Sequence, residues 1–340
     1  MCGIVGFTGE HQAAPILLDG LSKLEYRGYD SAGLAVRDGE NLAQVVKAKG
    51  RLSNLAEKTD DGHTLKGTCG IGHTRWATHG EPSQTNAHPH VSGNCSGSGS
   101  GMVESEVVGV HNGIIENYKQ IKEFLIGEGY SFVSETDTET VAKLLDYYYD
   151  GNPLTTISKV IGEIKGSYAL GILFRDFPDT LYAVRKDSPL IVGAGENENF
   201  IASDVPAIIH YTRNYYLLDT NDIAEVKKDS IRFFDVHGNE VFKEINTADW
   251  DVDAAEKGGY EHFMLKEIHE QPTAVKTTIT PRIQNHMPDF TAEGFDKEKL
   301  KDYKNIYIVA CGTAMHAGMV GKYVIEKLVR VPVVVDIASE

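Results

Sequence analysis

Residues 1–9 read MCGIVGFTG, a stretch that combines a cysteine directly after the initiator methionine with a glycine-interrupted apolar run. Its apolar residues Ile4, Val5 and Phe7 are interrupted by glycines, which predicts a buried β-strand whose backbone closely approaches another part of the molecule. If the initiator methionine is removed, the chain begins at Cys2, which then carries a thiol nucleophile and a free α-amine. An α-amine with a pKa of about 7.7 to 8.0 can accept the thiol's proton. Cys2 is therefore either an incidental residue at the chain end or a residue that holds nucleophile and base together.

The composition is that of a globular protein with about two domains, because the chain has 340 residues, of which 41% are hydrophobic and 24% charged. Its formal net charge is −16, from 33 basic and 49 acidic residues. This charge argues against nucleic acid or an anionic membrane as a partner, although it is compatible with a local basic pocket for a phosphate.

The cysteines and the start of the chain indicate the compartment. Cys2, Cys69, Cys95 and Cys311 show no CxxC pair and no spacing typical of paired disulfides. The N-terminus lacks a basic segment followed by an apolar run and a cleavage site, and no stretch approaches the roughly 18 apolar residues of a membrane span. We expect a cytoplasmic protein.

Strand-like segments dominate the first 240 residues, which predicts an α+β layered domain over residues 2–240. Apolar periodicity predicts helices over 14–26, 118–125 and 138–148. The Gly/Ser-rich stretch 94–106, NCSGSGSGMVESE, is expected at a hairpin tip because strand-like sequence flanks it. Residues 245–259 have the composition of an interdomain linker.

The last forty residues change in character. They read as an apolar strand at 306–310, a turn at 311–313, a helix at 314–328 and a strand at 331–336. This order predicts the start of a doubly wound α/β domain, whose first turn presents backbone N–H groups and Thr313 to a phosphate. One such unit cannot bury both faces of its sheet, so we expect either a piece of a longer protein or a tail that depends on a partner.

The densest polar cluster is residues 73–90, HTRWATHGEPSQTNAHPH. Arg75 offers a planar fork suited to a carboxylate, and Trp76 a large surface that resembles a lid. Thr78, His79 and Gly80 form a compact hydrogen-bonding turn. The alternative is a surface loop whose histidines are incidental. A zinc site at the four histidines, His73, His79, His88 and His90, is not expected because their spacing matches none of the usual structural sites.

Two further motifs each have a functional and a local interpretation. In residues 108–117, VGVHNGIIEN, the amide of Asn112 and the N–H of Gly113 can converge on one oxygen as an oxyanion hole, but an Asn-Gly pair alone favours a plain turn. In residues 134–140, SETDTET, Asp137 is either a helix cap or the partner of a ligand's ammonium group while Arg75 holds its carboxylate. A free amino acid presents both groups.

Together these motifs resemble the glutaminase domain of the glutamine–fructose-6-phosphate aminotransferase (isomerizing) family. The resemblance runs from residue 2 through the linker motif at 260–272, YEHFMLKEIHEQP, to 306–323, IYIVACGTAMHAGMVGKY. It implies an N-terminal-nucleophile (Ntn) hydrolase with an αββα sandwich, followed by the start of an α/β sugar isomerase (SIS) domain. The implied boundaries are 2–240 for the glutaminase domain, 241–265 for the linker and 266–340 for an incomplete SIS domain.

The resemblance also implies roles for individual residues. Cys2 becomes the nucleophile with its α-amine as base, and Asn112 with Gly113 the oxyanion hole. Arg75 and Asp137 would bind the α-carboxylate and α-amino groups of L-glutamine. Trp76 would gate the released ammonia. The remaining residues assist glutamine binding, namely Thr78, His79 and Gly80, or form a partial sugar-phosphate site, namely Cys311, Gly312 and Thr313.

The implied activity is hydrolysis of glutamine to glutamate and ammonia, which passes to fructose 6-phosphate to form glucosamine 6-phosphate. No cofactor and no metal are implied, and the family's SIS modules suggest a homodimer. The sequence differs from the family pattern in three respects. The stretch 94–106 looks longer than the usual connection, and Ala314 stands where the family commonly has a hydroxyl residue. The family chain is also nearly twice as long as this one. This chain alone is expected to retain only the glutaminase half-reaction.

Two competing interpretations are weighed against this one. Another cysteine-type amidotransferase, such as amidophosphoribosyltransferase, would share the first domain, but no run of adjacent acidic residues for a diphosphoribosyl group follows a strand. A non-catalytic sugar-phosphate sensor would keep the start of the SIS domain but would have a catalytically inactive first domain. The joint presence of Cys2, Arg75, Asn112 and Asp137 argues against inertness.

Overall fold

The computed structural model describes residues 2–39, 43–76, 80–93, 101–103, 106–248, 259–295 and 297–338. The chain divides into two compact units, Met1–Glu256 and Lys257–Glu340. This division falls inside the predicted linker 241–265. Within the same stretch, β16 (Asn246–Thr247) still pairs with a strand of the first unit.

The strand that begins after Cys2 is the centre of the first sheet, which confirms the predicted buried strand. β1 (Gly3–Thr8) is buried along its whole length and pairs antiparallel with β4 on one side and β11 on the other. A side chain at Gly6 would press into Ile201 of β11, so the glycine allows the close approach that its position predicts. In order across the sheet, the described strands are β16, β12 (Asn214–Leu217), β10 (Ile191–Ala194), β11 (Asn199–Ala202), β1, β4 (Cys69–Arg75), β2 (Ser31–Arg37), β3 (Ala43–Lys49) and β6 (Gly101–Val103).

The second sheet of the first unit is built around the long antiparallel pair β7 and β8, whose register runs from Val107 opposite Phe174 to Ile115 opposite Gly166. Its described strands, in order, are β15 (Glu240–Val241), β14 (Ile231–Phe234), β13 (Ile223–Val226), β9 (Leu181–Lys186), β8 (Gly166–Phe174), β7 (Val107–Ile115) and β5 (His90–Val91).

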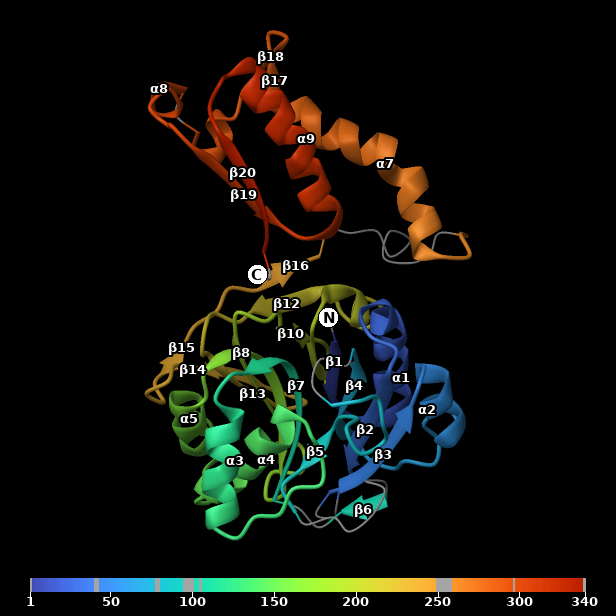
Figure 1. Ribbon diagram of the computed structural model, residues 1–340. Coiled ribbons are helices and arrows are strands. Elements are labelled where there is room, and N and C mark those ends of the chain that lie inside the picture. The colour runs from blue at the N-terminus through green and yellow to red at the C-terminus, as the bar shows by residue number, and fades with distance from the viewer. Residues whose placement is uncertain are drawn as a thin grey trace. The chain divides into compact units, whose positions relative to one another are not determined.

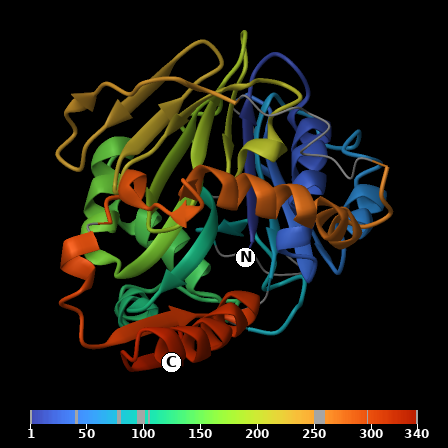
Figure 2. The ribbon, with the colours of Figure 1, turned by 90° about the horizontal axis from the view of Figure 1, so that it is seen from above.

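The two sheets are stacked between two layers of helices (Figure 1). Apolar side chains of both sheets, such as Ile4 and Val110, form the core between them. The helices α1 (Ala13–Leu24) and α2 (Leu52–Lys58) cover the first sheet, and α3 (Tyr118–Gly127), α4 (Asp137–Tyr148) and α5 (Pro153–Glu163) cover the second. In Figure 2, the blue helices α1 and α2 lie at the opposite side of this unit from the green helices. The predicted αββα sandwich is confirmed.

Two local predictions need correction. The Asn-Gly pair at 112–113 was expected to end a strand, but β7 continues through it to Ile115 because every residue of this stretch pairs with β8. The stretch 94–106 does connect two paired strands, β5 and β7, as a hairpin would. It is not all loop, however, since its residues 101–103 form β6 at the edge of the other sheet. The other residues of the stretch, 94–100 and 104–105, lie outside the described residues.

The second unit contains the predicted strand, helix and parallel strand. β19 (Ile306–Ala310) pairs parallel with β20 (Val333–Ile337), and α9 (Gly312–Leu328) connects them. The helix begins two residues earlier than expected, so Gly312 and Thr313 lie in its first turn. The other α-helices and strands described in this unit are α7 (Phe263–Ile279), α8 (Lys297–Leu300), β17 (Ile283–Gln284) and β18 (Met287–Pro288).

Short 3-10 helices complete the described chain, at Glu25–Arg27, Val205–Ala207, Thr280–Arg282 and Thr291–Glu293. Within the described residues, none of the helices combines the length and the apolar character that crossing a membrane requires.

Candidate active site

The thiol of Cys2 lies against the backbone of Trp76. Because β1 pairs with β4 in the register Gly3 opposite Thr74, Cys2 lies level with Arg75 at the end of β4, and Trp76 follows directly. The N–H of Trp76 donates to Cys2 Sγ at 3.2 Å, and the thiol faces the Trp76 carbonyl at 3.5 Å. Burial raises the pKa of the Cys2 thiol, while the Trp76 N–H and the positive charge of Arg75 oppose the rise. The thiol is therefore protonated at neutral pH and needs a base before it can attack.

Asn112 reaches Cys2 from the second sheet. Its Nδ2 donates to the Cys2 backbone carbonyl at 3.0 Å and to Ser203 Oγ, also at 3.0 Å. Its Oδ1 lies 2.9 Å from Nε2 of His73 on β4. The amide is thus held at both ends, with its nitrogen directed at the residue that carries the thiol.

Gly113, the next residue of β7, occupies a backbone conformation that only glycine tolerates well. Its φ is +132°, and a Cβ built on it would overlap the backbone carbonyl of Ser167 on β8. The glycine brings the main chain of β7 to the wall of the hollow that Cys2 also lines.

Arg75 is the last residue of β4 and is buried. Its guanidinium donates from Nη2 to the carbonyl of Gly80 at 3.2 Å and from Nη1 to that of Glu81 at 3.5 Å. Gly80 has a φ of +74°, and a Cβ there would press against Asn86. The arginine therefore also orders the turn that follows it.

Asp137 is not the helix cap that its position at the start of α4 suggests. Thr136 is the N-cap, because its Oγ1 accepts the N–H of Glu139 at 3.4 Å. The Asp137 carboxylate instead accepts the N–H of Ile115 at 2.9 Å and lies 3.8 Å from His111 Nδ1. The tertiary structure thus decides between the two interpretations of this residue by giving the cap to its neighbour.

One hollow brings these groups together. It is lined by Cys2, Arg75, Trp76, His88, His111, Gly113, Thr136, Asp137 and Thr138. A thiol, a buried guanidinium and a carboxylate therefore face the same space, which suits a molecule that bears a carboxylate and an ammonium group. A second hollow of about 230 Å³ shares Cys2, Trp76 and Gly113 with the first. Trp76 borders both, is 44% exposed and packs edge-on against Tyr29.

Four buried histidines, His73, His88, His90 and His111, lie at the hollow or next to it. His73 Nε2 is 3.1 Å from His88 Nδ1, and the rings of His88 and His90 meet edge-on. Burial lowers the pKa of His73 to about 3 and also lowers those of His88, His90 and His111. In the described part of the chain, no three His, Cys, Asp or Glu side chains are arranged to hold a metal ion.

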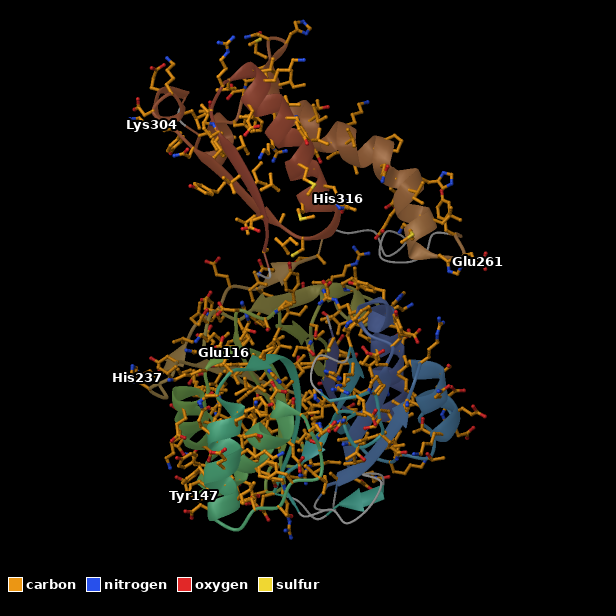
Figure 3. The ribbon with its side chains drawn as sticks, in the orientation of Figure 1. Glu116, Tyr147, His237, Glu261, Lys304 and His316 are labelled. Carbon is orange, nitrogen blue, oxygen red and sulfur yellow. The ribbon has the colours of Figure 1, made fainter. Side chains whose placement is uncertain are left out.

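The other expected site residues belong to the second unit or lie outside the described residues. Thr78 and His79 are outside the described residues. Cys311, Gly312 and Thr313 lie in the second unit, exposed at the start of α9, and His316 follows one turn later (Figure 3).

Sequence reasoning missed two residues that contact the site. His111 precedes the Asn-Gly pair directly, and its contact with Thr138 Oγ1 at 3.1 Å ties β7 to α4. Ser203 follows β11 and holds the Asn112 amide from 91 positions away. No local pattern marks Ser203, whereas the adjacency of His111 to Asn112 was a usable signal.

Comparison with known proteins identifies the family. The glutamine amidotransferase domain family matches residues 95–210. The chain is 57% identical over 341 residues to the glutamine–fructose-6-phosphate aminotransferase [isomerizing] of Caldanaerobacter subterraneus subsp. tengcongensis, which covers 100% of this chain and 54% of the relative. It is 54% identical over 342 residues to the enzyme of the same name from Clostridium tetani, with the same coverage.

A solved structure shares the fold. The glutamine phosphoribosylpyrophosphate amidotransferase from B. subtilis, complexed with ADP and GMP, aligns with a TM-score of 0.60 and 18% identity, over 98% of this chain and 65% of that one. The Ntn amidotransferase fold expected for the first domain is confirmed. The chain belongs to the glutamine–fructose-6-phosphate aminotransferase family and spans about half the length of the curated relatives it matches.

Proposed function

We propose that the first unit hydrolyses L-glutamine to glutamate and ammonia with Cys2 as the nucleophile. The observation that carries this proposal is the single hollow in which the Cys2 thiol, Arg75 and Asp137 meet beside Asn112 and Gly113. Arg75 binds the α-carboxylate of glutamine through its planar fork, and Asp137 binds the α-ammonium group. The side-chain amide of the substrate then extends toward the thiol.

The reaction begins with transfer of the Cys2 thiol proton to the α-amine of the same residue, after Met1 has been removed. This base is needed because burial raises the thiol pKa. The thiolate attacks the side-chain amide carbon of glutamine and forms a carbon–sulfur bond. The carbonyl electrons move to oxygen, and the resulting oxyanion is stabilised by N–H groups of Asn112 and Gly113.

The tetrahedral intermediate collapses when the protonated α-amine gives its proton to the departing nitrogen, which leaves as ammonia. A γ-glutamyl thioester remains on Cys2. Water attacks this thioester with the α-amine again as base. Glutamate is released, and the free thiol of Cys2 is regenerated. Both N–H groups of Asn112 have acceptors in the structure, the Cys2 carbonyl and Ser203 Oγ. The N–H that faces the Cys2 carbonyl therefore turns to the oxyanion during the reaction.

We further propose that, in the longer protein, the ammonia passes to fructose 6-phosphate and glucosamine 6-phosphate is formed. The relatives that share this name support the proposal, as do Cys311, Gly312 and Thr313 at the start of α9, whose N–H groups suit a phosphate. Trp76 would gate the ammonia because it borders both hollows that contain Cys2. We also propose that Thr78, His79 and Gly80 assist glutamine binding, and that the longer protein is a cytoplasmic homodimer.

One assay tests the central proposal. The chain with a free Cys2 terminus, confirmed by mass spectrometry, is incubated with glutamine and glutamate is measured. We expect glutamate release that is lost in Cys2→Ala and in protein that retains Met1. The matched control is Cys69→Ala, because burial raises the pKa of that thiol to about 12 and it lies away from the hollow. No glutamate from the processed wild type would overturn the proposal. Formation of glucosamine 6-phosphate is tested separately, with the longer protein and fructose 6-phosphate.

A further inference from the structure

One ring nitrogen of the buried His73 lies close to two oxygen atoms of β7. His73 belongs to β4 of the first sheet and has no exposed surface. Its Nε2 lies 2.9 Å from Oδ1 of Asn112 and 3.2 Å from the backbone carbonyl of His111. Its contacts therefore cross from one sheet to the other at the point where Asn112 meets Cys2.

These neighbours determine which nitrogen of the ring carries the hydrogen. A backbone carbonyl only accepts hydrogen bonds, so Nε2 of His73 must donate toward His111. Burial lowers the pKa of His73 to about 3, so the ring is neutral at pH 7 and carries one N–H. His73 Nδ1 has no hydrogen-bond partner within the described part of the chain, which agrees with a bare nitrogen there. His88 Nδ1, 3.1 Å from the same Nε2, must then present a lone pair.

The hydrogen on His73 and the carbonyl of Cys2 together determine the orientation of the Asn112 amide. An amide can be placed either way round, and its orientation is decided by the groups that surround it. With a donor at His73 Nε2, the oxygen Oδ1 faces the ring and Nδ2 faces the Cys2 carbonyl. The reverse orientation would set an N–H against the N–H of His73 and an oxygen against the carbonyl of Cys2.

We propose that His73 is a positioning residue that fixes the Asn112 amide with its N–H groups toward Cys2, and so prepares the donor for the oxyanion. The carbonyl of His111 determines which ring nitrogen of His73 carries the hydrogen, and this hydrogen favours the observed orientation of the Asn112 amide. This role rests on the proposed glutaminase function. It predicts that a side chain with a donor at the position of Nε2 can replace the ring.

The kinetic test compares His73→Met, which fills the space without a donor, with His73→Gln, whose amide nitrogen can replace Nε2. Loss of one oxyanion donor costs on the order of 10²–10³ in kcat, and a misoriented amide loses part of this. We expect kcat for glutamine to fall about 10- to 100-fold in His73→Met with KM nearly unchanged, and His73→Gln to restore most of it. Thr8→Val is the matched control, since it removes a partly buried side-chain hydrogen bond at the far end of β1.

A second reaction separates positioning from structural damage. Alkylation of Cys2 by iodoacetamide is a substitution that forms no oxyanion, so its rate should be equal in the wild type and in His73→Met. Equal losses of alkylation and hydrolysis would overturn the proposal, and so would an unchanged kcat. The His73 tautomer is read independently from ¹⁵N NMR of the whole 340-residue chain, with the hydrogen expected on Nε2.

A hydrogen on Nδ1 in that spectrum would also overturn the role of His73. This measurement needs no catalysis. It therefore distinguishes a failure of the inference from a failure of the proposed function, which would appear as a wild type that releases no glutamate.

Discussion

The carboxylate of Asp137 accepts a hydrogen bond from the backbone N–H of Ile115 at 2.9 Å, so the first residue of α4 is tied to the last residue of β7. Gly113 and Asn112 lie two and three positions earlier in the same strand. The bond therefore holds the proposed ammonium-binding carboxylate at a fixed distance from the proposed oxyanion donors. Substrate binding and transition-state stabilisation share one rigid strand.

Replacing Asp137 with Asn should weaken glutamine binding more than it slows the chemistry. Asn keeps an acceptor for the Ile115 N–H but loses the charge that pairs with an ammonium group. A hydrogen bond to a charged group contributes about 1.5–3 kcal/mol, so KM should rise about 10- to 100-fold with a smaller change in kcat. Steady-state glutaminase kinetics measure this. Asp150→Asn, an exposed charge beyond the end of the same helix, is the control, and an unchanged KM would contradict the role.

Arg75→Lys and Arg75→Gln separate the charge of the guanidinium from its shape. Lys keeps the positive charge but cannot reproduce the planar fork that also holds the carbonyls of Gly80 and Glu81. We expect KM for glutamine to rise in both variants, with Lys retaining part of the affinity and Gln very little. If Arg75→Lys bound glutamine as the wild type does, a bidentate role for this residue would be wrong.

Gly113→Ala should damage the site through the backbone. Its φ of +132° and the overlap of a Cβ with the Ser167 carbonyl predict a loss of about 2 kcal/mol or more of unfolding free energy, together with a fall in kcat. Chemical denaturation measures the first effect. Gly109→Ala is the matched control on the same strand, because the nearest atom to its Cβ would be 3.8 Å away. Equal stability of the two variants would refute the argument.

The buried histidines should make the first unit sensitive to mild acid. Folding lowers the pKa of His73, His88, His90 and His111. Below the unfolded pKa of about 6.5 the unfolded chain binds protons that the folded chain excludes, so stability falls as pH falls. For His73 the loss continues toward its folded pKa of about 3. Each histidine contributes at most about 1.4 kcal/mol per pH unit.

Thermal unfolding between pH 7 and pH 5 isolates this effect, because most carboxylates titrate lower. The Tm should decrease across this window, and His90→Gln should decrease less steeply because one titrating ring is gone. A Tm that stays constant from pH 7 to pH 5 would contradict the assignment of neutral rings.

The elements that sequence reasoning placed well are those with strong local patterns. The strand after Cys2 and the strand, helix and parallel strand of the second unit follow from apolar runs and periodicity. The prediction failed at 112–113, because an Asn-Gly pair is typical of turns while pairing with β8 keeps it extended. Asp137 was left undecided for a similar reason, since Thr and Asp both suit a cap and only the structure shows that Thr136 takes it.

The family, the αββα class of the first domain and the identity of the residues proposed for catalysis follow from the amino-acid sequence, because long contiguous motifs carry them. The tertiary structure alone decided how Asn112 is oriented. That orientation depends on His73 from β4 and Ser203 after β11, which lie 39 and 91 positions away in the chain. Contacts between sheets are made by packing, and no local pattern of residues specifies them.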